Sequence, residues 1–137
     1  MEHTTNYFNT FIEIAEDCPL SQAQLPPVHD EKLSAAALQF RLIRENPYHF
    51  SSDDILFKAY AYKHDLSPSE MESARETFFS KGQACLRASA LAKRYGWGFH
   101  FNEAGKVAIY SVESPEYAQF KNDPAVKSLR AMRNKRK

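Results

Sequence analysis

The stretch that decides the fold is Trp97-Gly-Phe-His-Phe-Asn-Glu-Ala-Gly-Lys-Val-Ala-Ile-Tyr-Ser-Val112. Its two halves, 97–101 and 106–112, alternate in the way that strands do. The four residues 102–105 between them end in glycine, which a hairpin loop commonly needs at a position of positive φ. The stretch therefore predicts a β-hairpin in the C-terminal half of the chain. One face of that hairpin carries Trp97, Phe99 and Phe101.

Two more segments have the pattern of strands. Thr10–Ala15 mixes aromatic and β-branched residues with a period near two. Ile55–Tyr62 alternates apolar residues with larger or polar ones, and we predict that Asp53 and Asp54 cap the turn that enters it. Together with the hairpin, these segments predict a sheet of about four strands that is at least partly antiparallel.

Helices are predicted from apolar residues at helical spacing and from capping residues. The first runs from an Asp30 cap to Glu45, and the second starts at Ser67-Pro-Ser-Glu70 and ends at Gly82. A third fits residues 83–94, and two short terminal helices start at the cap-and-proline pairs 114–115 and 123–124. The order of elements is that of a single α+β domain with four to five helices.

The domain is expected to span residues 1–132. Beyond it, residues 133–137 form a basic tail with no apolar side chain to bury, and we expect this tail to fray.

The composition is that of an ordinary globular protein. With 137 residues, 43% hydrophobic and 26% charged, the chain suits one core and argues against disordered, collagen-like and membrane-spanning classes. The N-terminus has no basic region followed by an apolar run, so we expect a cytoplasmic protein that does not associate with membranes. Cys18 and Cys85 are too few for a disulfide scaffold and are predicted to be free thiols.

The formal net charge of +1 conceals an uneven distribution of charge. Residues 1–76 hold 6 Lys and Arg against 13 Asp and Glu, whereas residues 77–137 hold 12 against 4. Opposite charges of this kind attract one another within a fold or between the subunits of a homo-oligomer. They can also form a basic surface for an anionic partner, and the sequence leaves both interpretations open.

One candidate site lies just before the predicted helix 83–94. Unpaired N–H groups and the macrodipole favour an anion at a helix N-terminus. Lys81 and Gly82 precede that terminus, and a polar stripe along the helix consists of Gln83, Arg87 and Arg94. The pattern predicts a site for a small anionic ligand, although no Walker phosphate loop is present. The alternative is a helix corner whose basic residues pair with the acidic half.

Cys85 suggests a second hypothesis, an enzyme with a reactive thiol. It lies in the first turn of the same predicted helix beside Lys81 and Arg87, an environment that raises thiol reactivity. A catalytic thiol also needs a base, and His100 is the histidine that lies near in sequence. The chain lacks both the Cys-x5-Arg loop of phosphatases and a Cys-x-x-Cys pair, so a packed thiol is the simpler interpretation.

The sequence predicts no metal site and no cofactor. Its five histidines show no i, i+3 or i, i+4 pairing with one another or with a cysteine. A zinc site would therefore have to be assembled entirely by the fold.

A nucleic-acid-associated protein is the third hypothesis. Aromatic side chains on strands and the basic C-terminal half combine stacking faces with cations, as single-strand binders do. The pI of about 7.8 lies below the values of dedicated binders, and the face with Trp97 fits a core better.

A set of motifs runs through nearly the whole chain. In order they are Asn6-Tyr-Phe-Asn-Thr-Phe-Ile-Glu-Ile-Ala-Glu-Asp-Cys-Pro19, Asn46-Pro-Tyr48, Phe79-Ser-Lys-Gly-Gln-Ala-Cys-Leu-Arg-Ala-Ser89, Lys93-Arg-Tyr-Gly-Trp-Gly98, Val112-Glu-Ser-Pro-Glu-Tyr117 and Arg130-Ala-Met-Arg133. In this order they resemble a family of small uncharacterised bacterial proteins, a domain of unknown function. The resemblance implies a bacterial, cytoplasmic, single-domain protein, and it brings no activity or catalytic residue with it.

The prediction from sequence is therefore a non-catalytic binding domain. Its site is expected around residues 81–100 and its partner is expected to be a small anionic ligand or another protein. The thiol enzyme and the nucleic-acid-associated protein are the alternatives.

Overall fold

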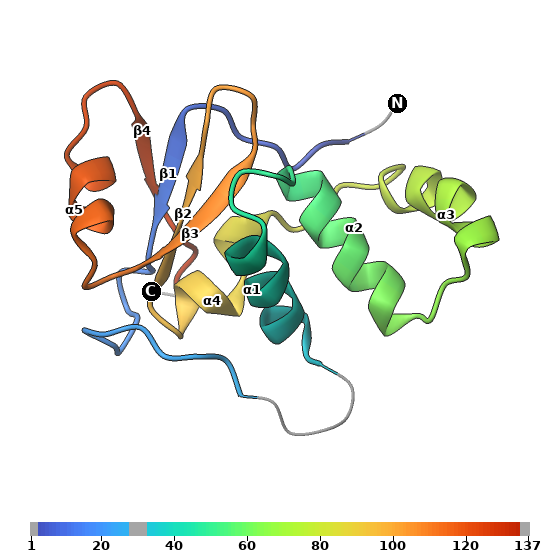
Figure 1. Cartoon of the computed structure of the whole chain (residues 1–137), viewed down its shortest axis with the longest axis horizontal. Coiled ribbons are helices and arrows are strands. Elements are labelled where there is room, and N and C mark those ends of the chain that lie inside the picture. The colour runs from blue at the N-terminus through green and yellow to red at the C-terminus, as the bar shows by residue number, and fades with distance from the viewer. Residues whose placement is uncertain (1–2, 28–32, 135–137) are drawn as a thin grey trace.

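A four-stranded mixed sheet forms the centre of the molecule. The computed structural model describes residues 3–27 and 33–134. Its strands are β1 (Thr10–Glu13), β2 (Trp97–Phe101), β3 (Val107–Ser111) and β4 (Lys127–Arg130). They lie in the order β3-β2-β1-β4 (Figure 1). β1 is antiparallel to β2 and parallel to β4, and β2 is antiparallel to β3.

Helices accompany the sheet in a single small α+β domain, which confirms the predicted fold class. In the described residues the α-helices are α1 (Ala35–Glu45), α2 (Ser52–Lys63), α3 (Met71–Phe78), α4 (Ala90–Lys93) and α5 (Pro115–Lys121). Two short 3₁₀ helices, η1 (Pro68–Glu70) and η2 (Leu86–Ala88), precede α3 and α4.

The predicted hairpin is present as β2 and β3. Phe99 pairs with Ile109 in its register, and Gly105 has the positive φ of 79° that the loop was expected to need. The side chains of Trp97, Phe99 and Phe101 are at most 7% exposed and belong to the main hydrophobic core. The hairpin therefore supplies one wall of that core.

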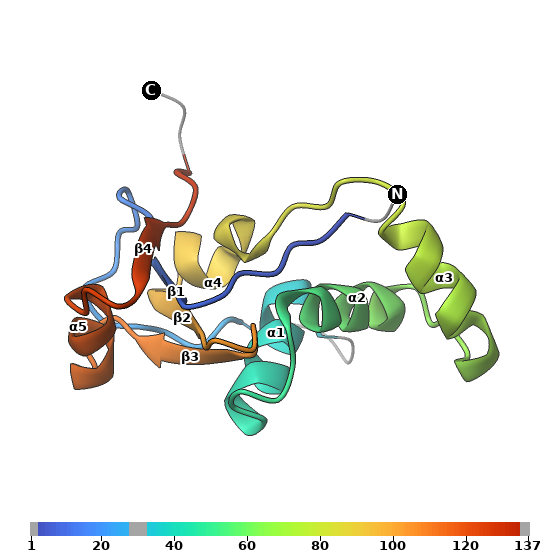
Figure 2. The ribbon, with the colours of Figure 1, turned by 90° about the horizontal axis from the view of Figure 1, so that it is seen from above.

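The two faces of the sheet are covered by different helices (Figures 1 and 2). On the face that carries Trp97, α1 packs through Phe40, whose ring centroid lies 4.8 Å from that of Trp97. On the opposite face, Tyr117 of α5 lies edge-on to Phe11 at 4.9 Å. Gly98 permits this approach, because a Cβ there would lie 2.7 Å from the Tyr117 ring.

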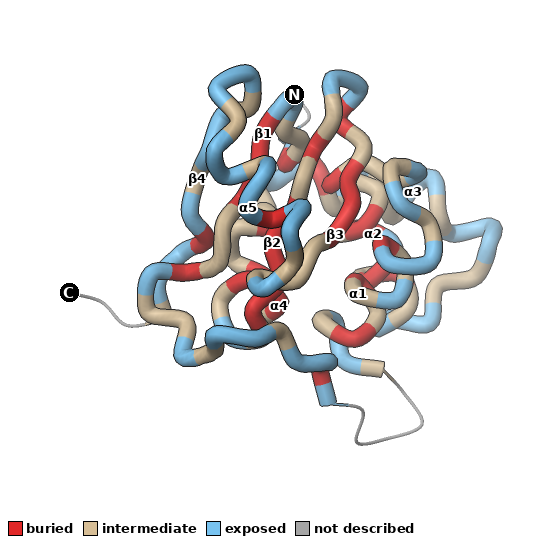
Figure 3. Tube along the Cα trace, turned by 60° about the vertical axis from the view of Figure 1, so that its left-hand side comes forward, coloured by how far each residue is buried: buried red, intermediate tan, exposed pale blue. Residues whose placement is uncertain are grey.

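The helices α2 and α3 extend away from the sheet, with α3 at the far end (Figure 2). They enclose a second, smaller apolar cluster, whose buried members are Phe57, Ala61 and Phe79. No residue of α3 itself is fully buried, and this helix is coloured intermediate and exposed in Figure 3. The position of α3 therefore depends mainly on its contacts with α2.

The prediction of a strand over residues 55–62 is wrong, because this segment lies inside α2. Ser51 and Asp54 form a capping box in which each side chain accepts the other residue's backbone N–H. Asp54 therefore caps a helix and not a turn that enters a strand. The buried residues of α2 are Ser52, Ile55, Phe57, Ala59 and Ala61. The last four of them alternate in sequence because α1 and α3 cover different sides of the helix.

The prediction of one helix over residues 83–94 is also wrong. The short helices η2 and α4 are separated by Ser89, whose backbone is extended at φ −67° and ψ 138°. The Ser89 hydroxyl accepts a hydrogen bond from the Leu91 N–H and donates one of 2.8 Å to the side chain of Gln39. Since the chain becomes helical only at Leu86, Gly82 does not precede a helix N-terminus.

Four further predictions concern where helices begin and end. The helix predicted to end at Gly82 ends at Phe78, as α3. The first helix begins at Ala35 with Ser34 as its cap, and Asp30 lies outside the described residues. The short helix predicted at Ser114-Pro115 is confirmed as α5. The one predicted at 123–124 is wrong, because Asp123 starts a turn that leads into β4.

The predicted basic tail, residues 133–137, is hydrogen-bonded to the domain near its start. Asn134 is hydrogen-bonded to the carboxylate of Asp17 and to the carbonyl of Lys93. Residues 135–137 lie outside the described residues.

Candidate functional site

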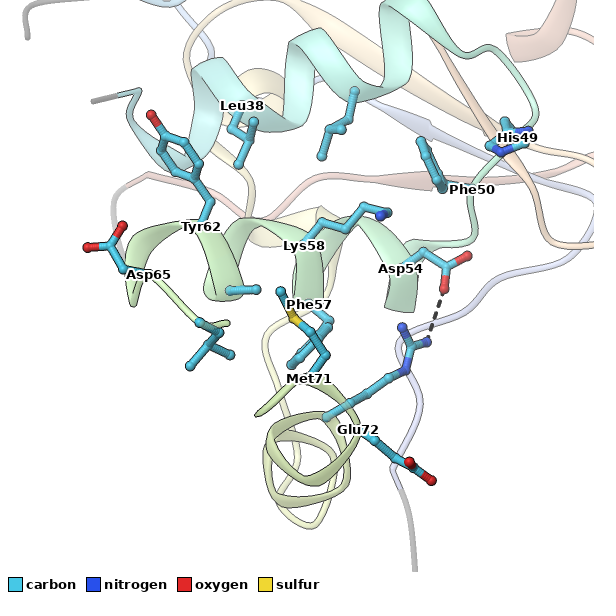
Figure 4. A pocket seen from close by; sticks show the side chains of 14 residues that line it. Leu38, His49, Phe50, Asp54, Phe57, Lys58, Tyr62, Asp65, Met71 and Glu72 are labelled. Atoms are coloured by element: carbon cyan, nitrogen blue, oxygen red, sulfur yellow. Dashed lines mark hydrogen bonds and ion pairs between the residues drawn. The ribbon is translucent and has the colours of Figure 1, made fainter. Parts of the chain in front are cut away.

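A groove between α1, α2 and α3 is the strongest candidate for a binding site. Its volume is about 870 Å³, and we call it the α1–α2–α3 groove. Its apolar lining consists of Leu38, Leu42, Phe50, Phe57, Ala61, Leu66 and Met71. Figure 4 shows that Leu38 reaches in from α1 while Phe57 and Met71 meet between α2 and α3. The groove thus has an apolar interior that three helices build together.

The ion pair between Arg75 and Asp54 lies at one end of the groove (Figure 4). The Arg75 guanidinium donates a hydrogen bond of 3.0 Å to the Asp54 carboxylate. It also lies over the rings of Phe57 and Phe79, at 5.6 and 5.4 Å from their centroids. Arg75 therefore fastens α3 to the start of α2.

Asp54 is ionised in this arrangement. Burial by itself would raise the pKa of its carboxyl group, but the hydrogen bonds from the Ser51 N–H and the Arg75 guanidinium outweigh burial. The pKa of Asp54 therefore lies below its ordinary value of 3.8.

The Lys58 side chain extends from α2 toward Phe50 (Figure 4). Its ammonium group lies 5.1 Å from the centroid of the Phe50 ring. The His49 ring lies edge-on to the same Phe50 ring at 4.7 Å. One cation and one imidazole thus stand at the end of the groove next to the Asp54–Arg75 pair.

A smaller cavity of about 330 Å³ lies on the other side of Arg75. Its wall includes Asp53, whose carboxylate accepts hydrogen bonds from the Thr4 hydroxyl and from the N–H and hydroxyl of Thr5. The Thr5 hydroxyl also meets that of the fully buried Ser52 at 2.9 Å. These bonds hold the N-terminal segment against α2, which is a structural role.

The residues predicted to bind an anion do not surround one cavity. Lys81 and Gly82 lie exposed in the loop before η2, and the Gln83 amide donates to the Phe78 carbonyl at 2.7 Å. The Arg87 guanidinium donates to the Arg130 carbonyl at 2.7 Å. Arg94 is directed to Asn134, near the C-terminal end of the described chain, at 3.4 Å.

Cys85 and His100 are also separated. The Cys85 thiol meets the Tyr7 hydroxyl at 3.1 Å. The Tyr7 ring packs against Phe101 on the core side of β2. His100 follows Phe99 and precedes Phe101 on β2, so its side chain lies on the other face of the sheet. The fold therefore does not bring this thiol and this imidazole together.

His100 belongs to a small polar cluster beside α5. Its Nδ1 lies 2.7 Å from the Tyr48 hydroxyl, which in turn meets the Tyr110 hydroxyl at 2.9 Å. The ring of Phe120 stacks on the imidazole at 3.8 Å. Burial lowers the pKa of His100 despite the nearby carboxylate of Asp123, so the imidazole is neutral at pH 7.

Burial raises the pKa of the Tyr48 hydroxyl, and its hydrogen bond to the Tyr110 hydroxyl raises the pKa further. Tyr48 is held with a positive φ of 58°.

Residues 2–137 match the model of a protein family described as a family of unknown function, DUF6157. The chain belongs to this family. The resemblance to a domain of unknown function is thereby confirmed, whereas a bacterial origin stays a prediction. A search of curated proteins found no match to the DUF6157 chain, and neither did a search of solved structures.

Sequence reasoning missed the groove of the DUF6157 chain because it assigned α2 as a strand. The spacing of Ser51 and Asp54 is that of a capping box and signals a helix start. With that helix in place, Phe57 and Lys58 fall on neighbouring sides of one element.

Two further observations concern the described residues of the DUF6157 chain alone. None of their helices is both long and apolar enough to cross a membrane. Within 3–27 and 33–134, no cluster of three or more His, Cys, Asp or Glu side chains is arranged to hold a metal ion.

Proposed function

We propose that this chain is a binding domain that holds a small molecule with a large apolar part in the α1–α2–α3 groove. The observation that carries the proposal is the groove itself, with a volume of about 870 Å³ and an apolar interior between polar ends. Ligand sites are typically concave, mostly apolar and about 300–1,000 Å³ in volume. This proposal keeps the binding domain predicted from the sequence and moves its site from residues 81–100 to the helices 35–78.

The packing around the groove supports a site that is formed before a ligand arrives. Phe57 and Ala61 on its floor are at most 6% exposed. The Asp54–Arg75 pair holds its third wall, α3, in position. A preformed site loses little conformational entropy on binding, which favours affinity for a small ligand.

Binding of the uncharged fluorescent dye Nile red tests the proposal. We expect its fluorescence to rise on titration with the protein, and Leu38→Trp to weaken binding at least about tenfold, because the indole would fill the groove. Ala118→Trp is the matched control, since Ala118 is exposed on α5 on the other face of the sheet. Circular dichroism confirms that both variants fold.

The proposal is overturned if the wild-type chain does not bind Nile red. It is also overturned if Leu38→Trp folds and binds the dye as tightly as Ala118→Trp, because the dye would then lie elsewhere.

A further inference from the structure

Lys58 places a cation in the α1–α2–α3 groove. Its ammonium group lies over the Phe50 ring. Among the described residues, no carboxylate lies within ion-pair distance of it. Lys58 is an exposed residue on the groove side of α2, so its ammonium group is available to a ligand that lies in the groove.

Asp54, one helical turn before Lys58, is already engaged by other partners. Asp54 is four residues before Lys58, a spacing at which the two side chains normally form an ion pair on a helix. The Asp54 carboxylate instead accepts hydrogen bonds from the Ser51 N–H and the Arg75 guanidinium. The capping box and α3 thus occupy the carboxylate that would otherwise neutralise Lys58.

The other charged side chains of the groove do not neutralise Lys58 at the end near Phe50. Glu72 and Asp65 also line the groove. The Glu72 carboxylate points away from Lys58, and Asp65 stands at the opposite end of α2 (Figure 4). Arg75 is paired with Asp54. A ligand that lies along the groove therefore meets an unpaired positive charge near Phe50 and apolar side chains beyond it.

We propose that the ligand of the groove is an amphiphilic carboxylate, with its carboxylate group at Lys58 and its hydrocarbon part along Leu38, Ala61 and Met71. The inference rests on the proposed function and adds the chemical class of the ligand. The α2 residues that line the groove run from Asp54 to Tyr62, a stretch about 12 Å long. This length suits a medium-length alkyl chain better than a compact ion such as phosphate.

Displacement of Nile red tests the chemical class. The competitors are decanoate, its neutral analogue decan-1-ol and decyltrimethylammonium, each used below the concentration at which it forms micelles. For each protein, the ratio of the decanoate and decan-1-ol dissociation constants reports the contribution of the carboxylate, since the alkyl chain is the same.

We expect Lys58→Met to shift this ratio about three- to tenfold against decanoate, because one charge-assisted contact at a partly exposed site is lost. Decan-1-ol affinity should stay unchanged, and decyltrimethylammonium should bind the variant better than the wild type. Lys58→Arg should retain the wild-type preference. Lys127→Met, which removes an exposed lysine from β4, should have no effect.

The outcomes separate this inference from the proposed function. If Nile red binds in the groove but Lys58→Met leaves the decanoate ratio unchanged, the inference is overturned and the proposed function stands. A ratio that shifts equally in Lys127→Met overturns it as well, because the effect would be one of net charge. Failure of the wild type to bind Nile red overturns both.

Discussion

Arg75 on α3 and Asp54 at the start of α2 are joined by a hydrogen bond of 3.0 Å, and both residues line the groove. No residue of α3 is fully buried, so apolar burial alone holds that helix weakly. The guanidinium also covers the rings of Phe57 and Phe79. Stability of the α2–α3 extension and the shape of the groove are therefore linked through one side chain.

Arg75→Met should lower the free energy of unfolding by about 1 kcal/mol and weaken Nile red binding. The ion pair is partly exposed, with Arg75 at 42%, so solvent screening limits its contribution, and the ring contacts add to it. Urea denaturation measures the stability change.

Arg41→Met is the matched control for this prediction. Arg41 pairs with Glu45 at 3.9 Å on the exposed side of α1. Its loss should change stability by no more than about 0.5 kcal/mol and leave dye binding intact. Equal effects of the two variants would contradict the role assigned to Arg75.

Low pH should weaken the ion pair between Asp54 and Arg75. The pKa of Asp54 is lower in the folded chain than its ordinary value of 3.8. Its contribution to stability is therefore complete above the unfolded pKa and is lost as the pH falls through the folded pKa. We expect the stability of Asp54→Asn to depend less on pH than that of the wild type below about pH 5. Urea midpoints measured across that range check this, and parallel curves for the two proteins would contradict it.

The elements that the sequence predicted correctly carry their own local signals. The hairpin has alternation and a glycine with positive φ. The helical turn after Ser67 has a capping box with Glu70 and a proline at its first position. Ser114 accepts the N–H of Tyr117 as the cap of α5. In each case a few neighbouring residues determine the backbone, so no distant contact is needed.

The elements that were predicted wrongly depend on distant contacts. α2 is buried on more than one side because α1 and α3 flank it, and this removes the single apolar face of a surface helix. β4 is a mostly exposed edge strand, and its strand form follows from its parallel pairing with β1. The groove could not be predicted while α2 was read as a strand, since its walls are three helices.

Gly98→Ala should destabilise the fold by about 1–3 kcal/mol, because a methyl group there overpacks the contact between the sheet and α5. The added Cβ would lie 2.7 Å from the Tyr117 ring and 2.8 Å from the Phe11 ring. Thermal unfolding measures the effect.

Gly82→Ala is the control for this substitution. The nearest atom to a Cβ at Gly82 is Nδ1 of His3 at 4.0 Å, so we expect a change within about 0.5 kcal/mol. A Gly98→Ala protein as stable as Gly82→Ala would mean that α5 does not pack against β2 in this way.

Alkylation of the two free thiols distinguishes a packed cysteine from a nucleophile. Cys18 and Cys85 are both partly buried, and Cys85 meets the Tyr7 hydroxyl, whose pKa is raised to about 12 by burial and by the thiol. Tyr7 is therefore a neutral phenol at pH 7 and unsuited to accept the proton of the thiol, while His100 lies on the other face of the sheet. We expect iodoacetamide to label both cysteines slowly and at similar rates at pH 7. Mass spectrometry of the peptides measures the labelling, and urea-unfolded protein is the control for full exposure. Rapid labelling of Cys85 alone, abolished by Tyr7→Phe, would instead favour the thiol enzyme.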